Sequence, residues 1–160
     1  MIPKTYQIAA LITAAILIFS VFLGYTFYAD AQALQQVYAE VETLDKIIPS
    51  LNSASIIFTL NITNPSSRNL YGLSSNFNIF IEENFIGTGS FSNYDVPAKT
   101  SIIQQVTINV NYKGLAESAI DLLQNWISGQ NSVLSITGNM TASVIFVLAT
   151  VSHEYTATSN

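Results

Sequence analysis

The chain begins with a long apolar segment. From Ile8 to Tyr28 there is no Asp, Glu, Lys or Arg. A helix rises 1.5 Å per residue, so about 21 residues span roughly 31 Å, which matches the hydrocarbon core of a bilayer. We therefore predict a transmembrane helix in residues 1–28, whose lipid-facing side chains include Ile8, Leu11, Ile16, Phe19, Phe22 and Tyr25.

The charges that flank this segment predict its orientation. Lys4 precedes it, and Asp30 is the first charge after it. The positive-inside rule then places the N-terminus in the cytoplasm and the rest of the chain outside the cell membrane. The alternative is a signal peptide cleaved after Ala31, because Ala29-Asp30-Ala31 offers suitably spaced small residues. The apolar segment exceeds the roughly 7–15 residues of a signal-peptide core, which favours an uncleaved anchor.

Residues 29–49 continue with a helical pattern. They contain no Gly, and Pro49 is their only proline. Apolar residues recur at spacings of three and four, which predicts a helical stalk with one apolar face. We expect this face to pack against the following domain or a neighbouring subunit, with a dedicated dimerisation zipper as the alternative. The face consists of Leu34, Val37, Val41, Leu44 and Ile48.

After Pro49 the apolar period changes from helical to alternating. Residues 55–63 place Ile56, Phe58, Leu60 and Ile62 on one face of a strand. We predict that residues 50–160 form an Ig-like antiparallel β-sandwich with one helix. Glu83-Asn84 is the expected turn of a hairpin, and Gly129 is the expected stop of the helix. The further strands are expected at 77–82, 85–91, 101–111, 133–138 and 142–152, with 142–152 as a central strand, and the helix at 114–127.

The order of these features resembles the late-embryogenesis-abundant type 2 family, also called the WHy (water stress and hypersensitive response) domain. The family pattern is an alternating strand that ends in Asn-Pro-Asn or Asn-Pro-Ser, a hairpin whose second arm carries an Ile-Gly-x-Gly-like step, and an Ile/Val-Pro-Ala loop. Another alternating strand, a helix and a final strand pair with a Gly between follow. The resemblance implies an Ig-like sandwich without a catalytic site, linked to stress protection and often held by a membrane anchor. The matching segments are Phe58 to Ser66, Phe77 to Gly89, Val96-Pro97-Ala98, Ile102 to Val110, Leu115 to Ile127 and Leu134 to Val151.

The composition argues against several other functions. Only 9% of residues are charged, the formal net charge is -5, and the basic residues are scattered, so we expect no nucleic-acid binding. Cys is absent and His153 is the only histidine, so neither a thiolate site nor a His-pair metal site can form. Glu82-Glu83 with Asp95 are conceivable cation ligands, but adjacent carboxylates at a turn are usually only solvated. We predict a protein without catalytic, cofactor or metal residues.

Two sequence motifs predict N-glycosylation. Asn61-Ile62-Thr63 and Asn139-Met140-Thr141 are acceptor sequons, whereas proline blocks Asn64-Pro65-Ser66. A chain rich in Ser, Thr and Asn also contains such triplets by chance. Asn61 and Asn139 are therefore candidates that depend on export of the domain.

These observations favour a non-enzymatic, membrane-tethered, extracytoplasmic module with a protective or structural role. Its expected partners are membrane lipid, through the N-terminal helix, and either another protein or a second copy of itself, because a weakly charged surface favours association. The alternative is an accessory subunit of a membrane or cell-surface assembly, such as a filament, an envelope layer or a larger membrane enzyme complex.

Overall fold

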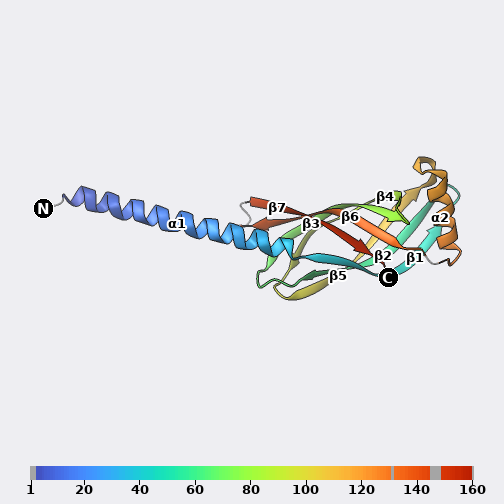
Figure 1. The fold of residues 1–160 in the computed structure, drawn as a ribbon, viewed down its shortest axis with the longest axis horizontal. Helices are drawn as coiled ribbons and strands as arrows, with labels where there is room; N and C mark the ends of the chain where they lie inside the picture. The colour runs from blue at the N-terminus through green and yellow to red at the C-terminus, as the bar shows by residue number, and fades with distance from the viewer. Residues whose placement is uncertain (1–2, 131, 145–148, 160) are drawn as a thin grey trace.

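The computed structural model describes residues 3–130, 132–144 and 149–159. One long helix, α1 (Lys4–Gln35), projects from an elongated β body, and a short helix, α2 (Glu117–Ile127), lies at the far end of that body (Figure 1). α1 has no proline inside it, and an 18-residue window within Thr5–Gln35 has a mean hydropathy of 2.4. It is long and apolar enough to cross a bilayer.

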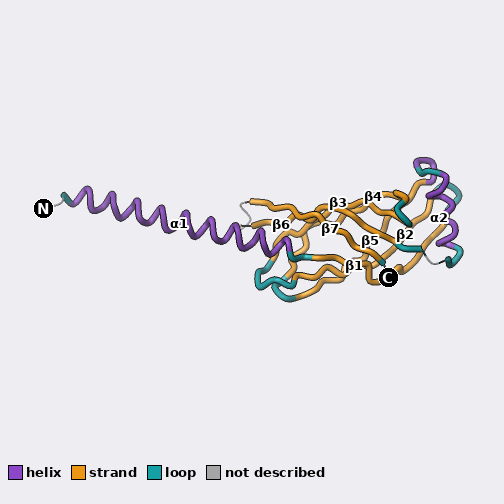
Figure 2. The backbone as a smooth tube through the Cα atoms, in the orientation of Figure 1, coloured by secondary structure: helices purple, strands orange, loops and turns teal. Residues whose placement is uncertain are grey.

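The β body consists of two antiparallel sheets that pack face to face (Figure 2). One sheet has the strand order β1-β2-β5, and the other has the order β4-β3-β6-β7. This is the β-sandwich that the alternating pattern predicts. The strands are β1 (Tyr38–Pro49), β2 (Ser53–Asn64), β3 (Leu70–Ile81), β4 (Asn84–Val96), β5 (Thr100–Asn111), β6 (Leu134–Val144) and β7 (Ala149–Thr158).

The centre of the core comes from β2. Ile56, Phe58, Leu60 and Ile62 are fully buried, while the residues between them lie on the partly exposed outer face. Each of these side chains stabilises the fold by roughly 1.5–3 kcal/mol relative to an exposed position. The alternation on β2 therefore fixes which face of the three-stranded sheet meets the other sheet.

The predicted helical stalk is wrong beyond Gln35. α1 ends there, and β1 pairs with β2 from Tyr38↔Thr63 to Pro49↔Ala54. This long ladder satisfies the backbone of β1 and adds an edge to the sheet, so a non-local pairing overrides the local helical spacing. Of the predicted apolar face, the residues Leu34, Val37 and Val41 are buried in the sandwich core, whereas Leu44 and Ile48 are exposed.

The predicted hairpin turn is shifted by one residue. Glu82 and Glu83 form the turn with φ angles of 48° and 71°, and Ile81 pairs with Asn84. Two consecutive positive φ angles are typical of a type I′ turn, whose twist matches that of the flanking strands. Asn84 is therefore the first residue of β4.

The last two predicted strands have different bounds in the structure. β6 runs through Gly138 to Val144, and β7 begins at Ala149. The segment predicted as one central strand, 142–152, is therefore divided between the central strand β6 and the edge strand β7. Residues 145–148 of that prediction lie outside the described residues. Gly138 marks a close approach between strands rather than a turn, because the Cα of Phe77 would lie 2.8 Å from a Cβ at this position.

The predicted second helix is confirmed as α2. A 3-10 turn over Tyr112–Gly114 precedes it, and Ala119 and Leu123 are buried against the sandwich. Gly129 follows with a φ of 88°, and its N–H donates to the carbonyl of Trp126 at 3.0 Å, so it ends the helix in the left-handed conformation.

Candidate functional site at the helix–sandwich junction

The surface of α1 changes character along its length. From Thr5 to Phe22 the side chains are exposed, whereas Thr26, Ala33 and Leu34 are buried. The last turns of α1 contact β3, β6 and β7. One helix thus provides a free apolar segment and then becomes part of the sandwich core. The residues predicted to face lipid, Ile8, Leu11, Ile16, Phe19, Phe22 and Tyr25, are all exposed, and their contact with lipid stays a prediction.

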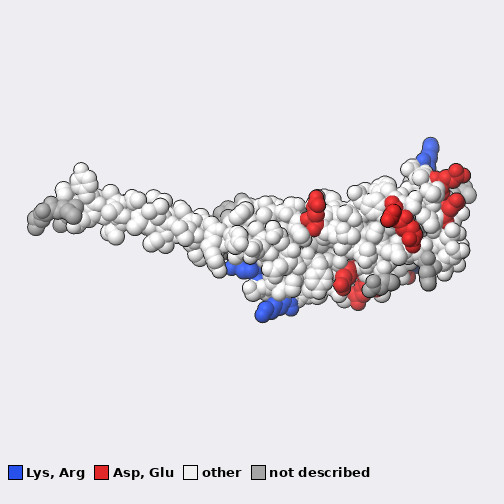
Figure 3. All heavy atoms as spheres, viewed as in Figure 1, with Lys and Arg blue, Asp and Glu red and all other residues white. Residues whose placement is uncertain are grey.

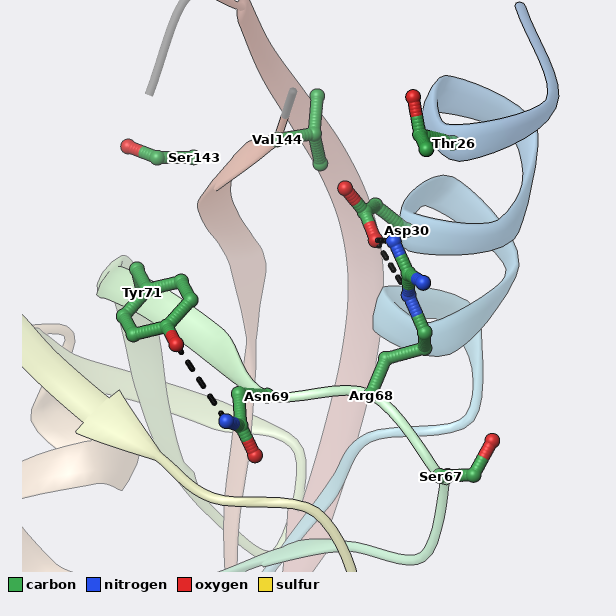
Figure 4. Close-up of a pocket in the computed structure, with 8 residues that line it drawn as sticks. All are labelled: Thr26, Asp30, Ser67, Arg68, Asn69, Tyr71, Ser143 and Val144. Atoms are coloured by element: carbon green, nitrogen blue, oxygen red, sulfur yellow. Dashed lines mark hydrogen bonds and ion pairs between the residues drawn. The ribbon is translucent and has the colours of Figure 1, made fainter. Parts of the chain in front are cut away.

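An ion pair joins α1 to the sandwich. The Nε of Arg68 donates to Oδ1 of Asp30 at 2.7 Å, and Nη2 of Arg68 contacts the same oxygen (Figure 4). The side chain of Asp30 is 15% exposed and that of Arg68 is 39% exposed. Solvent therefore screens the pair, and we assign it no more than about 1 kcal/mol of stability. The buried residues Ala33 and Leu34 dock α1 on the sandwich, and the ion pair adds a polar contact beside them.

The backbone that carries Arg68 is held by Asn64 at the end of β2. Asn64 is fully buried, and its Nδ2 donates to the carbonyls of Arg68 at 2.8 Å and Val96 at 3.0 Å. Its Oδ1 accepts from the N–H and the Oγ of Ser66 at 3.1 and 2.7 Å. The Asn-Pro-Ser and Val-Pro-Ala motifs therefore meet, and together they position Arg68.

A polar pocket of about 320 Å³ lies beside this ion pair, between α1 and the sandwich (Figure 4). Its wall contains hydroxyl, amide and charged groups as well as apolar surface. Thr26 donates to the carbonyl of Leu23 at 2.9 Å within α1, and the Nδ2 of Asn69 donates to the Oη of Tyr71 at 3.3 Å. The lining residues are Thr26, Asp30, Ser67, Arg68, Asn69, Tyr71, Ser143 and Val144.

Sequence reasoning did not single out this junction. In the sequence, Asp30 is the first charge after the apolar segment, and Arg68 is one of five scattered basic residues. Within a chain that is 9% charged, a basic residue two positions after the Asn-Pro-Ser motif is the signal that could have found it. The partner could not be deduced, because Asp30 and Arg68 are 38 positions apart in the sequence.

The two glycosylation candidates differ in their surroundings. Asn139 is exposed on the outer face of β6, in the four-stranded sheet. Asn61 is partly buried on β2, and its Oδ1 is buried without a hydrogen-bond partner among the described residues. Modification of either residue stays a prediction, and Asn139 has the more accessible side chain.

The residues considered for metal or catalytic chemistry do not converge. Oδ1 of Asp95 accepts from the N–H of Gly72 at 2.9 Å, and Oε1 of Glu82 accepts from the N–H of Val133 at 2.9 Å. These two carboxylates lie at opposite ends of β4. His153 is partly buried on β7, where it pairs with Met140 of β6. Within the described parts of the chain, no three His, Asp or Glu side chains gather as a metal site would require.

Comparison with solved structures identifies the class of the fold. No protein-family model matches the sequence, and no curated protein matches it. The solution structure of AT1g01470 from Arabidopsis thaliana, a type 2 late-embryogenesis-abundant structure, aligns with a TM-score of 0.50 at 14% identity, over 76% of this chain and 74% of that one. The chain therefore has a fold like that of the type 2 late-embryogenesis-abundant family.

Two further structures align with lower scores. A late-embryogenesis-abundant protein of Arabidopsis, At2g46140.1, has a TM-score of 0.42 at 10% identity, over 94% of this chain and 86% of that one. A protein from Archaeoglobus fulgidus has a TM-score of 0.36 at 10% identity, over 78% of this chain and 96% of that one. The assignment of the fold rests on AT1g01470.

Proposed function

We propose that this protein is a single-pass, membrane-tethered module whose sandwich lies outside the cell membrane and has a protective or structural, non-enzymatic role. The observation that carries the proposal is the continuity of α1, which passes from an exposed apolar segment into the sandwich core without a flexible linker. Such an arrangement holds the sandwich against the membrane surface in one orientation.

The dimensions of the free part of α1 support this role. Side chains are exposed from Thr5 to Phe22 and again at Tyr25, and Thr26 is the first buried residue of the helix. The segment from Thr5 to Tyr25 is about 21 residues, or roughly 31 Å of helix, which spans a hydrocarbon core without tilt. Tyr25 and Tyr28 then lie near one interface, where tyrosine is enriched.

The geometry around Ala31 supports an anchor that is retained. α1 continues past Ala31, and Ala33 and Leu34 pack in the core. Cleavage after Ala31 would remove Asp30 and leave Arg68 without this partner. The mature protein therefore keeps its N-terminal helix under this proposal.

Carbonate extraction and intact mass together test the anchor. The proposal expects the protein to remain in the membrane pellet at alkaline pH, with the mass of the full 17.4 kDa chain plus any glycan. A protein that begins at Gln32 and appears in the soluble fraction would show a secreted sandwich instead. In a host that glycosylates exported proteins, a glycan that Asn139→Gln removes would report that the sandwich faces outward.

A second candidate is an accessory subunit of a membrane or cell-surface assembly. Exposed apolar side chains on the sandwich favour it, since Leu51 is 93% exposed and Ile103 is 68% exposed. Native sizing after extraction in mild detergent separates the two candidates. Stable co-migration with other proteins would support an obligatory assembly, whereas a monomer would support the tethered module that acts alone.

A further inference from the structure

We propose that the pocket beside Asp30 and Arg68 binds the phosphate group of a membrane phospholipid, with Arg68 as the main ligand. This inference rests on the proposed membrane anchor. It adds a lipid-binding site to that role, and the site would hold the sandwich down on the bilayer at a second point.

The position of the pocket along α1 gives the first argument. If the hydrocarbon core ends near Tyr25, then Asp30 lies five residues further, or about 7.5 Å along the helix axis. The polar headgroup layer on one side of a bilayer is about 5–8 Å thick. Because Arg68 contacts Asp30 directly, its guanidinium lies at the depth of the lipid phosphates.

The chemistry of the lining gives the second argument. A guanidinium has five N–H donors, and Nε and Nη2 of Arg68 contact Asp30. Tyr71 accepts a hydrogen bond from Asn69 through its Oη, so its own O–H proton remains available for donation. Ser67 and Ser143 add hydroxyls to the same wall. Several donors around one arginine suit the oxygens of a phosphodiester.

The distribution of charge agrees with this assignment. On the face drawn in Figure 3, basic side chains lie at the α1 end of the sandwich, while the α2 end carries acidic side chains together with a further basic one. Lys99 belongs to the α1 end, because its N–H donates to the carbonyl of Ser66 at 3.0 Å. On this face, the end of the sandwich that meets the membrane therefore presents basic side chains to the lipid phosphates.

The test uses the full chain in a neutral detergent and native mass spectrometry. A phospholipid, phosphatidylglycerol, is compared with a diacylglycerol that has the same acyl chains and no phosphate. The proposal expects a one-to-one complex with the phospholipid only. Arg68→Gln should weaken this complex about tenfold or more, which is the effect of losing a charged hydrogen bond. Lys113→Gln, which removes a charge next to α2 at the far end of the sandwich, should leave it within about twofold.

A second variant separates direct binding from damage to the junction. Asp30→Asn breaks the same ion pair as Arg68→Gln but keeps the guanidinium in place. The proposal expects Asp30→Asn to bind phospholipid at least as well as the wild type, because Arg68 is then free. Equal loss in both variants would overturn it and show that the junction only needs to be intact.

Two further outcomes would also overturn the proposal. Diacylglycerol binding as tightly as phosphatidylglycerol would mean that the acyl chains alone are recognised. Displacement of the lipid by millimolar inorganic phosphate would identify a general anion pocket rather than a lipid site. Carbonate extraction tests the membrane anchor separately. Either result would therefore contradict the lipid-binding site without contradicting the anchor.

Discussion

Gly138 of β6 lies directly against Phe77 of β3. A Cβ at Gly138 would come within 2.6 Å of the Cβ of Phe77 and 2.5 Å of the carbonyl oxygen of Asn76. Gly89 of β4 lies on the other side of the same residue, where a Cβ would come within 2.4 Å of Cε2 of Phe77. Two glycines, on the two strands that flank β3, thus make room for one buried aromatic residue.

Gly138→Ala should destabilise the protein by about 1–3 kcal/mol, because an added methyl group would meet backbone atoms that cannot move aside. Gly89→Ala should cost less, since the atoms nearest to its Cβ belong to side chains, which can shift. Chemical unfolding of the detergent-solubilised chain measures both. Gly114→Ala is the control, because nothing lies within 4 Å of a Cβ there. Equal stability of the Gly138 and Gly114 variants would contradict the close approach.

Asn64→Ala should destabilise the protein by about 2–4 kcal/mol, because several buried carbonyl and N–H groups would lose their partner at once. Asn64→Asp should be at least as harmful at neutral pH, since a carboxylate would face the carbonyl oxygens of Arg68 and Val96. Acidification should partly restore the Asp variant by protonating that carboxylate. The unfolding midpoint at two pH values measures these effects.

Asn125→Ala, on the exposed surface of α2, is the control for Asn64. Helix propensity makes this change neutral or slightly stabilising. If Asn64→Ala lowers the stability no more than Asn125→Ala does, the buried hydrogen bonds of Asn64 do not organise the loop that carries Arg68.

Leu34→Ala should destabilise the sandwich by about 2–5 kcal/mol, because Leu34 is a fully buried core residue although it lies on α1. The same substitution at Leu11, which is 71% exposed, should leave the unfolding midpoint unchanged. Near-ultraviolet circular dichroism, recorded while the two variants are unfolded in detergent, gives the two midpoints for comparison. Similar midpoints for both would mean that the end of α1 is not part of the cooperative core.

Tyr155 makes stability sensitive to alkaline pH. Burial raises the pKa of Tyr155 to about 12, and the hydrogen bond from Ser75 opposes this shift only in part. In the unfolded chain the pKa is about 10. Below that value both states keep the proton, so the stabilisation by the neutral phenol is fully present. Between about 10 and 12 the unfolded state alone loses the proton, so the free energy of unfolding falls by up to about 1.4 kcal/mol per pH unit.

Tyr155→Phe should remove part of this alkaline loss, because phenylalanine has no proton to release. Urea unfolding of the detergent-solubilised chain between about pH 8 and pH 11.5 measures the slope. Tyr38→Phe, at an exposed residue, is the control. The same slope in the wild type and the Tyr155 variant would argue against the buried neutral phenol.

Several elements could be predicted from local sequence because their patterns fit one structure only. The apolar segment of α1 is too long and uniform for any strand, and α2 has a helical apolar face that ends at Gly129. In β2 the strict alternation of Ile56, Phe58, Leu60 and Ile62 allows only a half-buried strand. In α1 the length of the apolar segment excludes a strand, and in α2 and β2 the period of the apolar residues distinguishes helix from strand.

Residues 36–49 were ambiguous for a physical reason. A spacing of four, as between Val37 and Val41, places two side chains on one face of a helix and also on one face of a strand. Ala39 lies between them and is buried too, which is the period of a strand. Leu44 and Ile48 continue the helical spacing in the sequence, but both are exposed on β1, which has register shifts at Val41/Thr43 and Leu44/Lys46.

The sequence by itself determined the apolar helix, the sandwich class and the order of motifs, because each depends on neighbours within one segment. Only the tertiary structure decided that residues 38–49 form a strand and that Asn64 holds the loop that carries Arg68. It also decided that Arg68 contacts Asp30 on α1. These contacts join segments that are far apart in the chain. They stabilise the protein only after β1 has paired with β2 and α1 has docked on the sandwich.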